Sequence, residues 1–177
     1  MLKNDTHEVV VGLEIHAQLK TNSKAFCSDE VAFGASPNTL VSPVSLGHPG
    51  TLPVHNKEAV NMAIMLGLAC DCDIRKYNSY SRKNYFYADL PKGYQITQLD
   101  TPICNGGGIE ISLPDGTSKW INLTRIHMEE DTGKGIHDLD ISNTLMDYNR
   151  AGTALVEIVT EPDFRSGDEA YAFLMEI

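Results

Sequence analysis

Three segments of the chain place carboxylate and imidazole side chains among apolar residues. Glu14 and His16 stand two residues apart in a run, residues 9–19, that alternates between apolar and polar side chains. Because residues two apart in a β-strand project from one face, these two side chains are expected to lie side by side. Burying them unpaired would be costly. A pair of this kind on a single strand is also common as a solvent-facing or structural feature. A metal-binding or catalytic site is therefore indicated only if other strands carry further candidate residues.

The second and third segments supply further carboxylates. If residues 124–130 form a strand, His127, Glu129 and Asp131 share one face and Glu130 faces the other way. Glu157 stands alone between apolar neighbours in a segment with strand character. An isolated carboxylate in an apolar strand needs a cation or a metal ion as its partner.

Three strands that each carry a carboxylate, one of them also a histidine, would form a floor for a divalent cation. Oxygen-rich ligand sets suit Mg²⁺ or Mn²⁺, and one imidazole shifts the preference slightly toward Mn²⁺ or another transition metal. The residues alone leave a second interpretation open. In it, the acidic run after His127 is a solvated turn and Glu14 and His16 face solvent.

Composition narrows the class of protein. The chain has 177 residues, 42% of them hydrophobic, and a formal net charge of −10. The acidic balance argues against DNA binding and against charge-driven nucleic-acid binding by this chain alone. No apolar run reaches the ~18–20 residues of a membrane span, and the polar start, residues 1–8, lacks a signal-peptide pattern. We therefore expect a cytoplasmic protein without a membrane partner.

The expected elements describe an α+β fold. Residues 21–55 are rich in turn-forming residues, and such long segments are often functional loops. Ser166 begins a capping-box pattern whose helix is still running at Ile177, so the sequence is expected to belong to a longer protein. The remaining expected elements are strands at 9–19, 122–130 and 153–159, a helix at 56–68 after Asn56, and a hairpin of 109–113 with 119–123 around the turn 114–117.

Phosphate-binding chemistry has fewer signals. Neither a P-loop nor a G-x-G-x-x-G motif occurs, and no order of residues indicates a nucleophile. The basic residues Arg82, Lys83 and Lys92 alternate with aromatic residues in 78–100, which could suit a nucleotide or an RNA 3′ end. Core aromatics with solvated basic neighbours explain the same spacing. Arg150 is a fourth possible phosphate partner.

Six motifs in one order resemble a known family. The chain resembles the N-terminal part of the B subunit of the aspartyl/glutamyl-tRNA amidotransferases, from about residue 9 to the last residue. The motifs are VGLEIH at 11–16, RKNYFY at 82–87, LPKGYQ at 90–95, HMEED at 127–131, NRAGT at 149–153 and EIVTEPD at 157–163. Together they are highly specific.

The resemblance implies a fold and an activity. It implies one N-terminal catalytic domain over residues 1–177, an α+β cradle with a mostly antiparallel sheet and flanking helices, similar to glutamine synthetase. The family's C-terminal helical and tail domains are not in this sequence, so the chain alone is expected to be inactive. The implied reaction is a carbon–nitrogen ligation with glutamine as amido donor. ATP phosphorylates the side-chain carboxylate of Asp or Glu misacylated onto tRNA, and ammonia then gives Asn-tRNA(Asn) or Gln-tRNA(Gln).

The resemblance also implies roles for residues and partners. The family's metal ligands fall on Glu14, His16, Glu130 and Glu157, with Glu129 as a possible helper, and the implied cofactors are ATP and Mg²⁺, with Mn²⁺ possible. Lys83 and Arg150 are assigned to ATP phosphates or the acyl-phosphate. The implied partners are misacylated tRNA and the two other members of a heterotrimer, namely a glutaminase subunit that supplies ammonia and a small subunit that braces the assembly.

One departure from the family concerns zinc. Many members carry two cysteine pairs that could hold this metal. Here the corresponding segments, 27–29 and 42–45, retain only Cys27, so no structural zinc is expected.

Two alternatives to the amidotransferase interpretation are a small-molecule ligase similar to glutamine synthetase and a non-catalytic module that binds tRNA or another subunit. Binding of Mn²⁺ and ATP at one site would favour an enzyme over the binding module.

Overall fold

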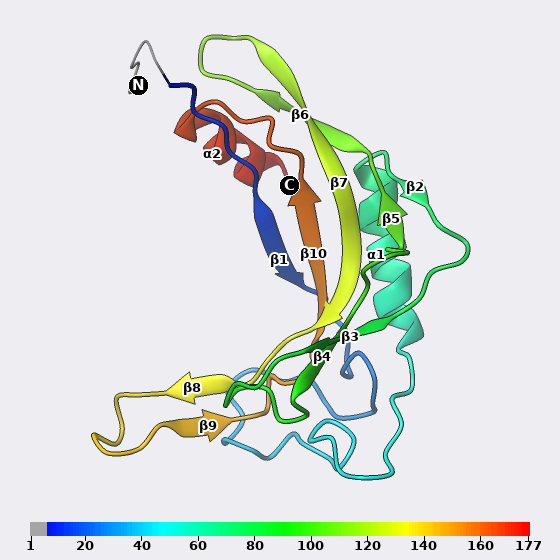
Figure 1. Cartoon of the computed structure of the whole chain (residues 1–177), viewed down its shortest axis with the longest axis vertical. Helices are drawn as coiled ribbons and strands as arrows, with labels where there is room; N and C mark the ends of the chain where they lie inside the picture. The colour runs from blue at the N-terminus through cyan, green and yellow to red at the C-terminus, as the bar shows by residue number, and fades with distance from the viewer. Residues whose placement is uncertain (1–6) are drawn as a thin grey trace.

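The computed structural model describes residues 7–177 and shows an α+β fold with antiparallel sheets. The first six residues lie outside the described part. They include most of the polar start from which the sequence predicts no signal peptide. A six-stranded sheet has the order β1-β10-β7-β5-β2, with β6 paired to β7 (Figure 1). Its strands are β1 (Glu14–Gln18), β2 (Asp73–Ile74), β5 (Cys104–Asn105), β6 (Gly108–Ser112), β7 (Ser118–Glu130) and β10 (Ala154–Thr160).

The long strand β7 organises this sheet. It pairs with β6 through its first half and with β10 through its second half. The hairpin expected around residues 114–117 is confirmed, because the Leu113 N–H donates to the Thr117 carbonyl and Gly116 has a φ of 84°. Two expected strands, 119–123 and 122–130, form one continuous strand. The expected strand at 9–19 is shorter, because only residues 14–18 pair along β10.

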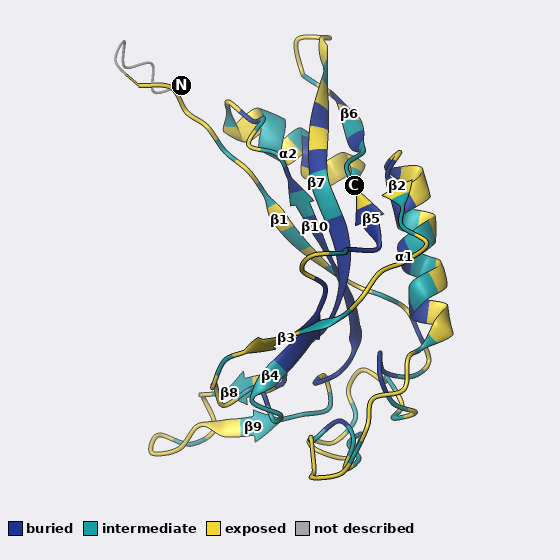
Figure 2. Cartoon of the chain, turned by 45° about the vertical axis from the view of Figure 1, so that its right-hand side comes forward, coloured by how far each residue is buried: buried dark blue, intermediate teal, exposed yellow. Residues whose placement is uncertain are grey.

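The two faces of the sheet differ in chemistry, as period-two alternation requires. Ile158 lies opposite both Ile15 and Ile126, and these residues belong to or pack against one apolar core. The core includes Ala59 and Ala63 of helix α1 (Lys57–Ala69), so α1 covers this face. The alternate positions of β1, β10 and β7 therefore point to the opposite face. Figure 2 shows that the C-terminal part of β7 and nearly all of β10 are buried.

Both helices begin where the sequence predicts. The Asn56 side chain accepts hydrogen bonds from the first turn of α1, which confirms the expected cap. The Ser166 side chain accepts from the Glu169 N–H at the start of α2 (Gly167–Glu176). Phe173 anchors α2 in the core, where its ring contacts that of Phe164 edge to face.

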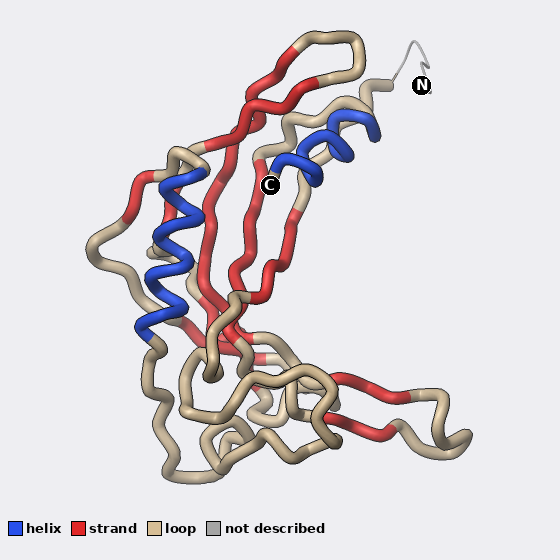
Figure 3. The backbone as a smooth tube through the Cα atoms, turned by 180° about the vertical axis from the view of Figure 1, so that it is seen from behind, coloured by secondary structure: helices blue, strands red, loops and turns tan. Residues whose placement is uncertain are grey.

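Two small hairpins complete the fold. β3 (Ser81–Asn84) pairs with β4 (Tyr94–Thr97), and this hairpin crosses the C-terminal end of β7. β8 (Lys134–Ile136) pairs with β9 (Leu145–Asp147) and projects away from the main sheet (Figure 3). Loops fill much of the same end of the molecule, as the turn-rich segment 21–55 predicts. No helix in the described residues is both long and apolar enough to cross a membrane.

Candidate metal and nucleotide site

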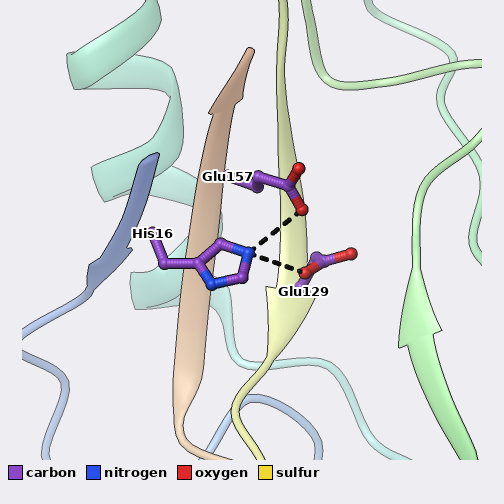
Figure 4. A group of neighbouring side chains, drawn as sticks. All are labelled: His16, Glu129 and Glu157. Carbon is purple, nitrogen blue, oxygen red and sulfur yellow. Dashed lines mark hydrogen bonds and ion pairs between the residues drawn. The ribbon is translucent and has the colours of Figure 1, made fainter. Parts of the chain in front are cut away.

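The register of three strands brings the polar residues of separate segments together. His16 of β1 lies opposite Glu157 of β10, and Glu157 lies opposite His127 of β7. Glu129 follows two residues after His127 and so shares its face. Figure 4 shows His16, Glu129 and Glu157 converging from these three strands. The structure thus places polar side chains from three separate strands in one group.

The convergence is close enough for one ion. His16 Nε2 lies 3.1 Å from Glu157 Oε2 and 3.7 Å from Glu129 Oε2. One ligand atom from each of the three residues lies within 4.8 Å of the other two. Within residues 7–177, no other set of three or more His, Cys, Asp or Glu side chains meets this condition. Two carboxylates and one imidazole form a donor set that fits Mg²⁺ or Mn²⁺.

The group is buried on the β7 side and open on the β1 side. Glu129 is 2% exposed and Glu157 is 8% exposed, whereas the His16 side chain is 57% exposed. Burial alone would raise the pKa of the Glu129 carboxyl. Hydrogen bonds from His127 and Thr97, with smaller contributions from the charges of His127 and Lys83, outweigh burial, so this pKa lies below its usual value. The contacts that lower this pKa favour the charged carboxylate, which is the form that binds a metal ion.

Strand β4 positions Glu129. The Thr97 hydroxyl donates to Glu129 Oε1 at 2.6 Å, and Gln95 Nε2 lies 3.3 Å from Glu129 Oε2. Gln95 Nε2 also donates to the Glu130 carbonyl at 2.7 Å, which ties β4 to the end of β7. The sequence interpretation placed Glu129 only as a helper and gave Thr97 no role. Alternation with His127 was the signal that could have favoured Glu129, but nothing local indicates Thr97.

An open pocket of about 390 Å³ lies beside the group. Glu14 lines this pocket together with Glu129 and Glu157, but Glu14 does not belong to the close three-residue group. The same pocket is lined by three basic residues, Arg82, Lys83 and Arg125. Lys83, predicted as a phosphate contact, therefore stands next to the candidate ligands, and Arg125 is an addition that the sequence interpretation missed.

Glu130 lies apart from this pocket. Its Oε1 accepts a hydrogen bond from the Ile96 N–H at 2.9 Å and forms an ion pair with Lys92. Both side chains of the pair are more than nine-tenths buried. Glu130 and Lys92 line a separate, small cavity of about 70 Å³. The structure thus does not bring Glu130 together with Glu14, His16 and Glu157.

Arg150 also lies outside the lining of the main pocket. Its Nε donates to the Thr132 carbonyl at 2.9 Å and its Nη2 to the Gly133 carbonyl at 2.8 Å. Its guanidinium lies 3.5 Å from the Asp131 carboxylate. These contacts order the turn after β7, and the side chain remains about half exposed at 46%.

Comparison with known proteins agrees with the motifs. A family model described as the GatB/GatE catalytic domain matches residues 9–177. The chain is 56% identical over 170 residues to the B subunit of the aspartyl/glutamyl-tRNA(Asn/Gln) amidotransferase of Pseudomonas fluorescens, covering 96% of this chain and 35% of that protein. The B subunits of an Anaeromyxobacter species and of Desulfotalea psychrophila are each 55% identical over 170 residues, covering 96% of this chain and 35% and 36% of their own lengths. The chain thus spans about a third of the length of these curated relatives. It belongs to the family of GatB/GatE catalytic domains.

Proposed function

We propose that this chain carries the phosphorylation site of a tRNA-dependent amidotransferase. In this proposal, ATP phosphorylates the side-chain carboxylate of Asp or Glu misacylated onto tRNA, and ammonia then displaces phosphate to give Asn-tRNA(Asn) or Gln-tRNA(Gln). The observation that carries the proposal is the group of His16, Glu129 and Glu157 next to a basic pocket wall. The relatives are named as B subunits of an aspartyl/glutamyl-tRNA(Asn/Gln) amidotransferase, which supports the choice of substrate.

The residues suit a reaction that needs no protein nucleophile. A carboxylate is a poor electrophile and must become a mixed anhydride before ammonia can attack it. Phosphoryl transfer depends on positioning and on cations that offset the charge of the transferring oxygens. His16, Glu129 and Glu157 would hold Mg²⁺, with Glu14 at the edge of the pocket. A bound Mg²⁺ supplies positive charge at the phosphoryl oxygens.

The basic wall would hold the anionic substrates. Lys83 lines the pocket and its charge already acts on Glu129, so we assign it to the phosphates of ATP or to the acyl-phosphate. Arg82 and Arg125 line the same pocket and add positive charge there. The roles of Glu130 as a metal ligand and of Arg150 as a phosphate contact stay predictions. The contacts of Glu130 with Lys92 and of Arg150 with the Thr132 carbonyl do not support these roles.

The wider assembly follows from the family and is part of the proposal. Residues 1–177 would form the catalytic cradle, with a sheet similar to that of glutamine synthetase, inside a carbon–nitrogen ligase that uses glutamine as amido donor. The glutaminase subunit would deliver ammonia, and the small subunit would complete the heterotrimer. The cytoplasm, where aminoacyl-tRNA and ATP occur together, is the proposed compartment.

Calorimetric titration of this chain with Mn²⁺, with and without a non-hydrolysable ATP analogue, tests the site. We expect saturable binding that the analogue strengthens and that Glu157→Gln abolishes. Glu110→Gln is the matched control, because Glu110 is exposed on β6, away from the pocket, and accepts a hydrogen bond from Ser118 in the same hairpin. Equal binding by both variants, or no binding by the unaltered chain, would contradict the proposed site.

The reaction itself is tested in a complete relative. The substitution equivalent to Glu157→Gln in the Pseudomonas fluorescens B subunit, assembled with its partner subunits, should abolish ATP-dependent transamidation and leave glutamine hydrolysis measurable. Full transamidation by that variant would exclude the proposed role.

A further inference from the structure

His127 is the second imidazole of the polar face, and the proposed ligand set leaves it without a role. Its side chain is only 4% exposed. Its Nε2 lies 3.2 Å from Glu129 Oε1 and 3.4 Å from Glu157 Oε2. Like His16, it therefore contacts both candidate carboxylate ligands, but from a buried position. His127 could either be a further metal ligand or donate hydrogen bonds to those carboxylates.

The contact on the other ring nitrogen decides between these two roles. Arg125 Nε donates a hydrogen bond to His127 Nδ1 at 3.3 Å. A guanidinium group has only donors, so Nδ1 must be the acceptor and carry no hydrogen. In a neutral imidazole the hydrogen then resides on Nε2. That hydrogen is donated to Glu129 Oε1, with Glu157 Oε2 at 3.4 Å from the same nitrogen, and a nitrogen that bears a hydrogen has no lone pair to offer a metal ion.

We propose that His127 is a positioning residue for the metal site and that Arg125 fixes its tautomer. His127 Nε2–H lies against Glu129 Oε1 and Glu157 Oε2, which come from different strands. It leaves Glu129 Oε2 directed toward His16 and shares Glu157 Oε2 with His16. This inference rests on the proposed function only in that the oriented carboxylates are metal ligands. Its chemical consequence is a site with one imidazole ligand instead of two, which keeps the donor set rich in oxygen and suited to Mg²⁺ or Mn²⁺.

The tautomer is measured on the metal-free chain by ¹⁵N NMR of the histidine rings, assigned with His127→Gln. We expect an unprotonated Nδ1 and a protonated Nε2 at His127. Arg125→Met should produce a mixture of tautomers, whereas Arg82→Met, which removes the same charge from the same pocket without touching His127, should not. A hydrogen on Nδ1 in the unaltered chain, or no change in Arg125→Met, would overturn the inference.

The Mn²⁺ affinity of His127 variants distinguishes a histidine that donates a hydrogen bond to the carboxylate ligands from one that binds the metal ion itself. His127→Gln retains an N–H near the position of Nε2, whereas His127→Leu retains none. Loss of a hydrogen-bonding partner of a metal ligand weakens binding by about 10–100-fold. We expect this loss of Mn²⁺ affinity in His127→Leu and most of the affinity restored in His127→Gln, with folding of both variants checked by circular dichroism. Equal losses in both folded variants would overturn the positioning role.

Metal preference gives a third readout. Releasing the tautomer with Arg125→Met frees Nε2 to bind a metal ion, so affinity for Zn²⁺ should rise relative to Mn²⁺. An unchanged ratio would contradict the assigned role of Arg125. If the unaltered chain bound no Mn²⁺ at all, the proposed function would fail, while the tautomer measurement would still decide whether His127 donates to the two carboxylates.

Discussion

The Lys92–Glu130 ion pair should be a major determinant of stability. The exposed fractions of the two side chains are 8% for Lys92 and 4% for Glu130. Lys92→Met leaves the Glu130 carboxylate buried with the Ile96 N–H as its remaining donor at Oε1. Removing one partner of a buried ion pair leaves an uncompensated charge and costs about 3–5 kcal/mol. We expect Lys92→Met to lower the free energy of unfolding by that amount.

Urea denaturation followed by circular dichroism measures the effect. With a denaturant slope of about 2 kcal/mol per molar, the midpoint should fall by roughly 1.5–2.5 M. The double variant Lys92→Met/Glu130→Gln removes both charges and should recover most of the loss, because replacing a whole buried pair is often nearly neutral. Lys57→Met, on the exposed start of α1, is the control and should change stability by less than about 0.5 kcal/mol.

Two results would refute this reasoning. A loss below about 1 kcal/mol in Lys92→Met would place the pair in the range of exposed ion pairs, contrary to its burial. A double variant as unstable as the single one would show that packing of the lysine stem, and not the unpaired carboxylate, carries the effect.

Four further predictions concern other parts of the chain. A hydrogen bond from Lys119 helps to outweigh burial and lower the pKa of Glu169, so Lys119→Met should lower the free energy of unfolding by up to about 1 kcal/mol at pH 7. In urea titrations at several pH values, this loss should shrink as the pH falls below the unfolded pKa of about 4.3 and through the lower pKa of the folded state. Ser166→Ala removes the N-cap of α2 and should lower the free energy of unfolding in urea by about 1 kcal/mol, whereas a null effect would exclude the cap contact. Burial raises the pKa of Cys72 to about 12 and that of Cys104 to about 11, so mass spectrometry should find both thiols unalkylated in the folded chain at pH 8 and alkylated in urea. The same purified chain should contain no stoichiometric zinc by elemental analysis.

The alternation of residues predicted most of the polar face. Glu14 and His16 share a face of β1 as expected, and Glu157 sits in an apolar strand between them and β7. The same rule places Glu129 with His127 and turns Glu130 away, as the structure shows. The family motif favoured Glu130 as a ligand over its neighbour, so the periodicity of the strand and the resemblance gave different answers at this one step.

The parts of the site that the sequence did not predict depend on contacts between distant segments. Thr97 reaches Glu129 across 32 residues of sequence, and Lys92 reaches Glu130 across 38. These contacts exist because the β3–β4 hairpin crosses the end of β7, and no local pattern in residues 81–97 encodes that crossing. Arg125 was missed for a different reason. Its role comes from a hydrogen bond to His127, and a basic residue in a strand has many possible partners.

The central claim is that His16, Glu129 and Glu157 bind one divalent cation. Anomalous diffraction from crystals of this chain grown with Mn²⁺ tests it directly, because the metal is located without reference to the protein chemistry. We predict one strong peak in contact with His16 Nε2 and with oxygens of both carboxylates, at or slightly beyond the ~2.0–2.1 Å typical of Mg²⁺. A peak beside Glu130 alone, or no peak in this pocket at saturating Mn²⁺, would contradict the account.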